Sequence, residues 1–218
     1  MKTKLLEGAI LDTIKHGTRY EDRDQSWYEN RVDWMVKNNT FLCLSLRSVT
    51  QSHGTPEVFI VLLRDVKPNP NNIQWGVFSL KEEKLILPMG DYSGIGFGGN
   101  GDDEKNPKYL QVRSGHGKDA KEDLFSLVER KLMGFEKMSP TYSWEGFWSV
   151  CVGDKWGMFS IGDDKLVVPI EYKEVSMAPR EKDWKKRKLV LVVDTDDRRA
   201  LYSLESQSIR GTWHEVVK

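Results

Sequence analysis

The stretch that decides the fold is Trp156-Gly157-Met158-Phe159-Ser160-Ile161, which is followed by Lys165-Leu166-Val167-Val168-Pro169. An earlier stretch has the same pattern and the same internal spacing: Trp75-Gly76-Val77-Phe78-Ser79-Leu80, then Lys84-Leu85-Ile86-Leu87-Pro88. Self-similarity of this kind is typical of a repeated supersecondary unit. Alternating residues predict two strands in each copy, and the short polar link predicts a turn between them. We therefore expect each copy to form a β-hairpin.

The side-chain types within each copy predict how the hairpin is built. Gly76 and Gly157 share a face with the following aromatic residue, and we expect a glycine there to leave room for a neighbouring ring or backbone. Pro88 and Pro169 are expected to stop the return strand, because proline has no ladder donor. A degenerate third copy ends the sequence, with Ala200-Leu-Tyr-Ser-Leu204 and Trp213-His-Glu-Val216 but without the Trp-Gly pair and the proline.

The remaining sequence predicts helices around this β-rich part. Leu5, Leu6, Ala9, Ile10 and Ile14 recur at helical spacing before Gly17, and a second helix is expected from Asp24 or Ser26 to 38–39. Strands are expected at 41–49, 58–65 and 109–112, and a helix at 119–133. We predict a mainly β (α+β) fold, an antiparallel meander of repeated hairpins with helices packed on the sheet. The segments of this single domain, 1–218, are a helical part at 1–39, strands and the first copy at 40–90, an insert at 91–140, and the later copies at 141–218.

Composition excludes several classes of protein. The 218 residues carry 33 Lys and Arg against 33 Asp and Glu, and 39% are hydrophobic. That content supports a core, and zero net charge disfavours a general nucleic-acid binder. Cys43 and Cys151 are too few for a disulfide framework. No apolar run reaches the roughly 18 residues of a membrane span, so we expect a cytoplasmic protein.

A glycine-rich loop lies in the insert. Gly94, Gly96 and Gly99 match a dinucleotide-binding pattern, but three acids follow where a helix should hold the phosphate. Residues 98–103 also match one unit of a calcium β-roll, which needs stacked copies, although three carboxylates could hold a loose Ca²⁺. We predict a partner-binding loop at Asp102, Asp103 and Glu104, with no cofactor and no metal.

The sequence leaves an enzyme or small-ligand binder open as an alternative. His53 and His116 lie in expected loops of the sequence, and either could pair in space with Cys43 or Cys151 as a thiol–imidazole nucleophile. Both cysteines fall in apolar strands, which favours buried, inert thiols. None of the four histidines has a His or Cys at the spacing of a local zinc site. A carboxylate of the glycine-rich insert would complete such a site.

A basic segment at 180–188 surrounds Trp184. Basic residues beside an aromatic ring can clamp RNA, so an RNA-binding accessory protein using Lys185–Lys188 is a second alternative. Acids gather elsewhere, at 102–104, 119–123 and 194–197. Separated patches on a neutral chain are typical of proteins that steer a protein partner. We therefore add Trp184, Lys185 and Arg187 to the expected contact residues.

The second copy, Lys155-Trp-Gly-Met-Phe159 and Lys165-Leu-Val-Val-Pro-Ile-Glu-Tyr-Lys-Glu-Val175, resembles the WG-repeat (KWG-repeat) family of bacterial proteins. The first copy keeps Trp75, Gly76 and Pro88. The resemblance implies a repeat scaffold, and some members of that family look like immunity proteins encoded beside secreted toxins. We therefore expect a non-catalytic protein-binding module, monomeric before it binds, that neutralises a cognate toxin.

Overall fold

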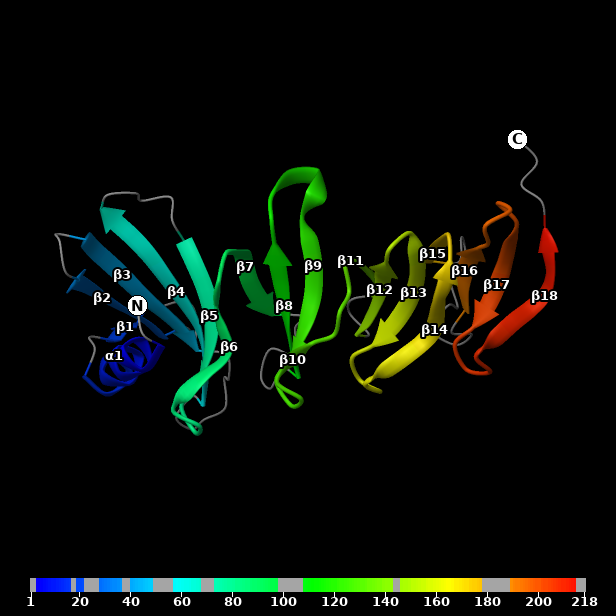
Figure 1. Ribbon diagram of the computed structural model, residues 1–218. Coiled ribbons are helices and arrows are strands. Elements are labelled where there is room, and N and C mark those ends of the chain that lie inside the picture. Colours follow the sequence, from blue (N-terminus) through cyan, green and yellow to red (C-terminus); the bar gives the residue numbers. More distant parts are fainter. Residues whose placement is uncertain are drawn as a thin grey trace. The chain divides into compact units, whose positions relative to one another are not determined.

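The computed structural model in Figure 1 describes residues 3–16, 19–21, 28–36, 40–48, 57–67, 73–97, 108–142, 146–177 and 189–214. Within these residues, antiparallel strands form four sheets in chain order, and one α-helix precedes them. The sheets fall into two compact units, with residues up to Leu132 in the first and those from Met133 in the second. The predicted mainly β fold is therefore confirmed.

The first sheet is a six-stranded meander with a helix on one face. Its strands are β1 (Arg19–Glu21), β2 (Tyr28–Val36), β3 (Thr40–Ser48), β4 (Val58–Lys67), β5 (Ile73–Ser79) and β6 (Lys84–Gly90). The helix, α1 (Thr3–His16), buries Leu6 and Ile10 against Phe59, Val61 and Phe78 of the sheet. This helix and its packing were expected from the apolar spacing at its start. The spacing works because residues three and four apart share one helix face.

A second sheet completes the first unit. Its strands are β7 (Tyr92–Phe97), β8 (Tyr109–Ser114), β9 (Lys121–Ser126) and β10 (Lys131–Leu132). Ile95, Leu110 and Phe125 of this sheet share one core with Ile60 and Val77 of the first. The first sheet is thus covered on one face by α1 and on the other by the second sheet, which explains why its central strands are apolar on both faces.

The second unit holds two four-stranded meanders. One contains β11 (Lys137–Tyr142), β12 (Phe147–Val152), β13 (Lys155–Ser160) and β14 (Lys165–Tyr172), and the other β15 (Glu174–Met177), β16 (Leu189–Val193), β17 (Arg199–Ser203) and β18 (Ser208–His214). Met158 and Val168 of one sheet pack with Val190, Val192 and Tyr202 of the other. Each unit therefore builds its core by facing one meander with the next.

The second predicted helix is wrong, because residues 28–36 form strand β2. This strand pairs antiparallel with β3, where Val32 lies opposite Leu44 and Trp34 opposite Leu42. The sequence carries the signal for a strand, since Val32, Trp34 and Val36 alternate with other residues at period two. Pairing with β3 satisfies the backbone of this segment and decides the conformation.

The predicted helix at 119–133 is also wrong. A short 3₁₀ turn, η2 (Gly117–Asp119), leads into strands β9 and β10 instead. Phe125-Ser126-Leu127 and Lys131-Leu132 match the aromatic-Ser-aliphatic and Lys-Leu positions of the hairpin repeat. The helical spacing of Leu124, Val128 and Leu132 is coincidental, because Val128 is 76% exposed while Leu124 is buried. The insert therefore contains a fourth copy of the repeat.

The glycine and proline of the repeat lie at a β-bulge. The ladder between β13 and β14 shifts register beside Gly157, and a Cβ built there would lie 2.7 Å from the carbonyl oxygen of Val168. The same shift occurs beside Gly76. The expected need for a small residue is confirmed. The expectation that proline stops the return strand is wrong, because Pro88 lies inside β6 and Pro169 inside β14, where the bulge frees a ladder position.

Candidate protein-binding surface

All four hairpins are closed by the same serine contact. The serine that ends the first strand of each hairpin is at most 2% exposed. Its hydroxyl oxygen accepts a hydrogen bond from the backbone N–H three residues later. The pairs are Ser79 with Glu82 at 3.2 Å, Ser126 with Glu129 at 3.0 Å, Ser160 with Asp163 at 3.2 Å, and Ser203 with Ser206 at 3.2 Å. A buried hydroxyl thus satisfies a turn N–H that would otherwise lack a partner.

The next residue of each turn has a left-handed backbone. The φ angles are 51° at Glu83, 60° at Arg130, 55° at Asp164 and 50° at Gln207. Non-glycine residues adopt such angles uncommonly. Four occurrences at the equivalent position show that the four turns have one conformation. We call them the Ser turns: 79–84, 126–131, 160–165 and 203–208.

The exposed tips of the Ser turns have no common chemistry. They read Lys-Glu-Glu at 81–83, Val-Glu-Arg at 128–130, Gly-Asp-Asp at 162–164 and Glu-Ser-Gln at 205–207, and every one of these residues is exposed. The buried positions repeat and the exposed ones vary. One sequence signal could have found the turn at 126–131. The triplet Phe-Ser-Leu at 125–127 is identical to residues 78–80, and residues 159–161 and 202–204 each differ from it at one position.

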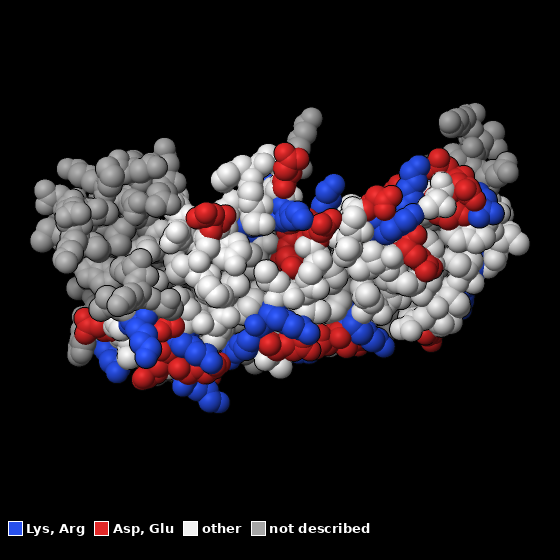
Figure 2. Space-filling model, viewed as in Figure 1, with Lys and Arg blue, Asp and Glu red and all other residues white. Residues whose placement is uncertain are grey.

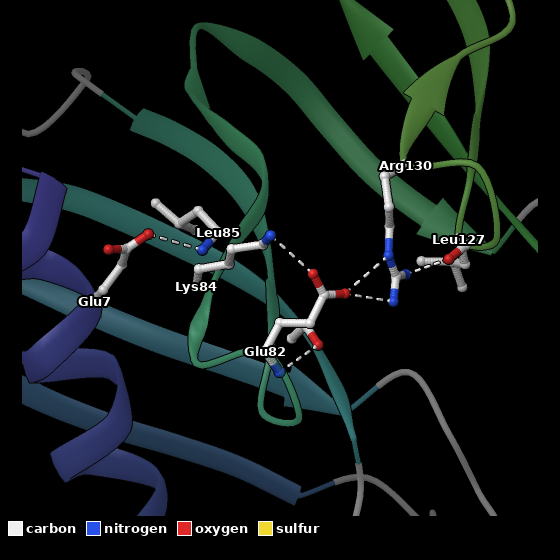
Figure 3. Close-up of polar contacts among 7 residues, drawn as sticks. Glu7, Glu82, Lys84, Leu85, Leu127 and Arg130 are labelled. Carbon is white, nitrogen blue, oxygen red and sulfur yellow. Dashed lines mark hydrogen bonds and ion pairs between the residues drawn. The ribbon is translucent and has the colours of Figure 1, made fainter.

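Side chains join the two Ser turns of the first unit (Figure 3). The carboxylate of Glu82 lies 3.0 Å from Nζ of Lys84 and 2.9 Å from Nη2 of Arg130. Nη1 of Arg130 donates a hydrogen bond to the carbonyl oxygen of Leu127. The hydrogen bond from Lys84, together with the positive charge of Arg130, lowers the pKa of Glu82. On the other side of β6, Glu7 of α1 accepts the N–H of Leu85 at 3.0 Å. The turn is therefore held from both sides.

Charges of both signs lie together around these turns. Figure 2 shows blue and red side chains mixed at the lower edge of the first unit, where the β5–β6 and β9–β10 turns lie in Figure 1. Lys131 also pairs with Glu129 at 2.6 Å. This edge therefore has no single sign of charge.

The acidic turn between β16 and β17 is a closed network. Oδ1 of Asp194 accepts the N–H groups of Asp196 and Arg198, and Oδ2 accepts the guanidinium of Arg198 at 2.6 Å. Burial opposes the charge of Asp194, but these hydrogen bonds outweigh it and lower the pKa of its carboxyl. Lys173 pairs with Asp197. The acids at 194–197 are thus largely paired within the chain, which weakens their part in the predicted charge separation.

Cys151 is placed as an inert thiol. It is buried on β12, and its Sγ donates to the carbonyl of Gly153 at 3.4 Å. Burial raises the pKa of this thiol, with Lys137 opposing the effect. His116 is exposed before η2 and gives that turn no side-chain cap. Cys43 lies on β3, and His53 lies outside the described residues. The expectation of a buried Cys151 is confirmed.

The expected contact residues lie where the structure describes nothing. Asp102, Asp103, Glu104, Trp184, Lys185 and Arg187 all fall outside the described ranges, as do Gly98 and Gly99. Gly94 and Gly96 lie on β7, paired antiparallel with β8 opposite Arg113 and Gln111. The prediction of a loop is therefore wrong for Gly94 and Gly96, and an antiparallel strand does not present a helix N-terminus to phosphate.

Two general features of the described residues bear on function. Among them, no group of three or more His, Cys, Asp or Glu side chains could hold a metal ion. The single α-helix in this part of the chain is too short to cross a membrane, and no other described helix could do so. No family model matches the sequence, and no curated protein matches it.

Proposed function

We propose that the protein is a non-catalytic protein-binding module of the WG-repeat type. It acts in the cytoplasm as an immunity protein that binds and neutralises a cognate toxin. It is monomeric until it binds. The resemblance of residues 155–175 to that family supports this function, and the hairpin architecture is the scaffold that it requires.

The observation that carries the proposal is the contrast between the inside and the outside of the Ser turns. The buried serine, the aromatic residue before it and the left-handed residue are kept in all four copies. The exposed tips differ in charge and size. A scaffold that repeats its internal contacts and varies its surface is suited to display side chains to a partner, as repeat proteins do.

A thiol nucleophile at Cys151 would need a different arrangement. An activated nucleophile requires a lowered pKa or an adjacent base, whereas the pKa of Cys151 is raised by burial. The binding function instead needs exposed side chains on rigid turns. The acidic loop at Asp102, Asp103 and Glu104 and the basic segment with Trp184, Lys185 and Arg187 remain the contact residues proposed from the sequence.

The direct test uses the product of the gene adjacent to that of this protein. Both proteins are purified, mixed and analysed by size-exclusion chromatography with light scattering. We expect a complex of one copy of each, and growth rescue when both are expressed in cells that the neighbouring product inhibits. Separate elution of the two proteins at concentrations of about 10 µM, together with no rescue, would contradict the proposal, because specific interfaces of standard size bind more tightly than this.

A further inference from the structure

One sheet face in the second unit lacks the covering that its equivalents have. In each copy of the repeat, the residue before the aromatic lies on the face opposite to it. Val77 is fully buried in a core with the second sheet, and Met158 is fully buried in a core with the last sheet. The equivalent residue of the last sheet is Leu201, which is 36% exposed. Among the described residues, therefore, no further sheet packs on this face.

The register of the last sheet shows which residues share the face with Leu201. One row across the strands contains Ser176, Leu191, Leu201 and Arg210, and the next contains Glu174, Val193, Arg199 and His214. Opposite faces alternate along a strand, so Val190, Val192 and Tyr202 point to the core of the unit instead. We call the two rows the outer face of β15–β18, the sheet that runs from yellow β15 to red β18 in Figure 1.

Arginine replaces tryptophan on this face. Trp75 and Trp156 pack against the cores that cover their sheets, and Arg199 has the equivalent position in the last sheet. The side chains of Arg199 and Arg210 make no hydrogen bond and no ion pair with the described residues, although their backbones pair in the sheet. The neighbouring Arg198 differs, because it pairs with Asp194 and lies 5.8 Å from the ring centroid of Trp213.

We propose that the outer face of β15–β18 binds an acidic protein surface with an apolar centre, an assignment that rests on the proposed function. Leu201, which is 36% exposed, and the partly buried Leu191 form an apolar centre, and Arg199 and Arg210 flank it with two charges that no described side chain pairs. A partner that brings carboxylates to both arginines and buries the leucines complements the charged and apolar groups that Arg199, Arg210, Leu191 and Leu201 present, provided that it places no acid opposite Glu174.

Two other occupants fit the face less well. A second copy of the chain would bring two copies of Arg199 and Arg210 into one interface with two copies of Glu174 as the acids of the described rows, so the positive charges would outnumber the negative ones. A nucleic acid backbone gains its affinity by neutralising many phosphates, and two arginines supply few contacts. It would also leave the two leucines without an apolar partner.

The test compares matched charge reversals for binding to the adjacent gene's product by isothermal titration calorimetry. Arg199→Glu and Arg210→Glu are each expected to raise Kd about 30-fold or more, because close charge pairs at interfaces couple strongly. Leu201→Ser is expected to raise it about tenfold. Lys137→Glu is the control, since Lys137 is exposed on β11 of the same unit and lies outside both the Ser turns and the outer face, and it should change Kd less than threefold. Thermal melting confirms that each variant is folded, and Arg199→Gln with Arg210→Gln provides a milder pair.

The outcomes separate this assignment from the proposed function. If the wild-type protein forms a complex, and Arg199→Glu and Arg210→Glu bind as tightly as Lys137→Glu, the assignment is overturned and the proposed function stands. Absence of a wild-type complex overturns both. If the protein binds a 20-nucleotide single-stranded RNA and the two charge reversals abolish that binding, the assignment is overturned in favour of nucleic acid. If the protein dimerises with increasing concentration and Leu201→Ser abolishes the dimer, the assignment is overturned in favour of a second copy of the chain.

Discussion

The hydroxyl oxygen of Ser126 accepts a hydrogen bond from the backbone N–H of Glu129 at 3.0 Å. The same contact closes the three other hairpins, and in each the serine is almost fully buried. The relationship identifies residues 121–132 as a copy of the repeat, although they lack the tryptophan, glycine and proline of the clearest copies. The buried serine, rather than the Trp-Gly pair, is therefore the feature common to all four.

Replacing the turn serine should destabilise any of the hairpins. Ser126→Ala and Ser203→Ala each remove a buried acceptor and leave a turn N–H without its partner, so we expect the free energy of unfolding to fall by about 1–2 kcal/mol. Urea unfolding followed by tryptophan fluorescence measures this. The control is Ser206→Ala, whose exposed hydroxyl bonds only Ser208 and which should change stability by less than about 0.5 kcal/mol. Equal effects for Ser203 and Ser206 would show that burial of the serine is unimportant.

The bulge glycine should tolerate no side chain. In Gly157→Ala the new Cβ would lie 2.7 Å from the carbonyl oxygen of Val168 and 2.9 Å from the backbone nitrogen of Ile170. Backbone atoms cannot move aside as a flexible side chain can, so we expect a loss of about 1–3 kcal/mol in the free energy of unfolding. Gly162→Ala is the matched control, because nothing lies within 4 Å of a Cβ there. A neutral Gly157→Ala would contradict the close approach of the return strand.

Acid should weaken the second unit through Asp194. The pKa of its carboxyl is lower in the folded chain than in the unfolded chain, where it is about 3.9. Its contribution to stability is therefore complete above that value and is lost as the pH falls through the folded pKa. Asp194→Asn should flatten the decline of melting temperature below about pH 4 while keeping acceptors for the turn N–H groups. If the melting temperature of the variant falls with acid as steeply as that of the wild type, the pH dependence belongs to other carboxyl groups.

Cys151 should react slowly in the native protein. Burial raises the pKa of its thiol, so little thiolate forms at neutral pH, and the side chain is inaccessible to reagents. We expect iodoacetamide to label Cys151 at least about tenfold more slowly in the native state than in urea, as measured by peptide mass spectrometry. The unfolded chain is the control, because both cysteines should then react alike. Rapid native labelling would restore the thiol-nucleophile alternative.

Local information in the sequence was enough for the helix α1 and for three of the four hairpins. The apolar spacing of Leu6 and Ile10 and the alternation around Phe78, Phe159 and Tyr202 are short-range patterns, and each element forms where its pattern predicts. The glycine of the repeat was also understood correctly, because the need for a small residue follows from the approach of one strand to another.

For the fourth hairpin and strand β2 the sequence carries competing local signals, and tertiary structure decided between them. In this copy Asp123 has the position of the bulge glycine, two residues before the aromatic residue. Strand β10 ends at Leu132 and does not extend far enough to lie opposite Asp123, so no glycine is needed there. The helical spacing of Leu124, Val128 and Leu132 competed with the Phe-Ser-Leu triplet at 125–127, and it favoured the wrong structure. Pairing of β9 with β8, and of β2 with β3, satisfied the backbone groups of these segments and decided against helices.

The sequence by itself determined that this protein is built from repeated β-hairpins, because strand, turn and bulge residues act over a few positions. It also gave the candidate contact residues at 102–104 and 184–187, because charged residues that are adjacent in the sequence can be recognised without a structure. Tertiary structure decided which faces are covered. Val77 and Met158 are buried and Leu201 is half-exposed, although all three have the same place in the repeat, because burial depends on whether another sheet follows.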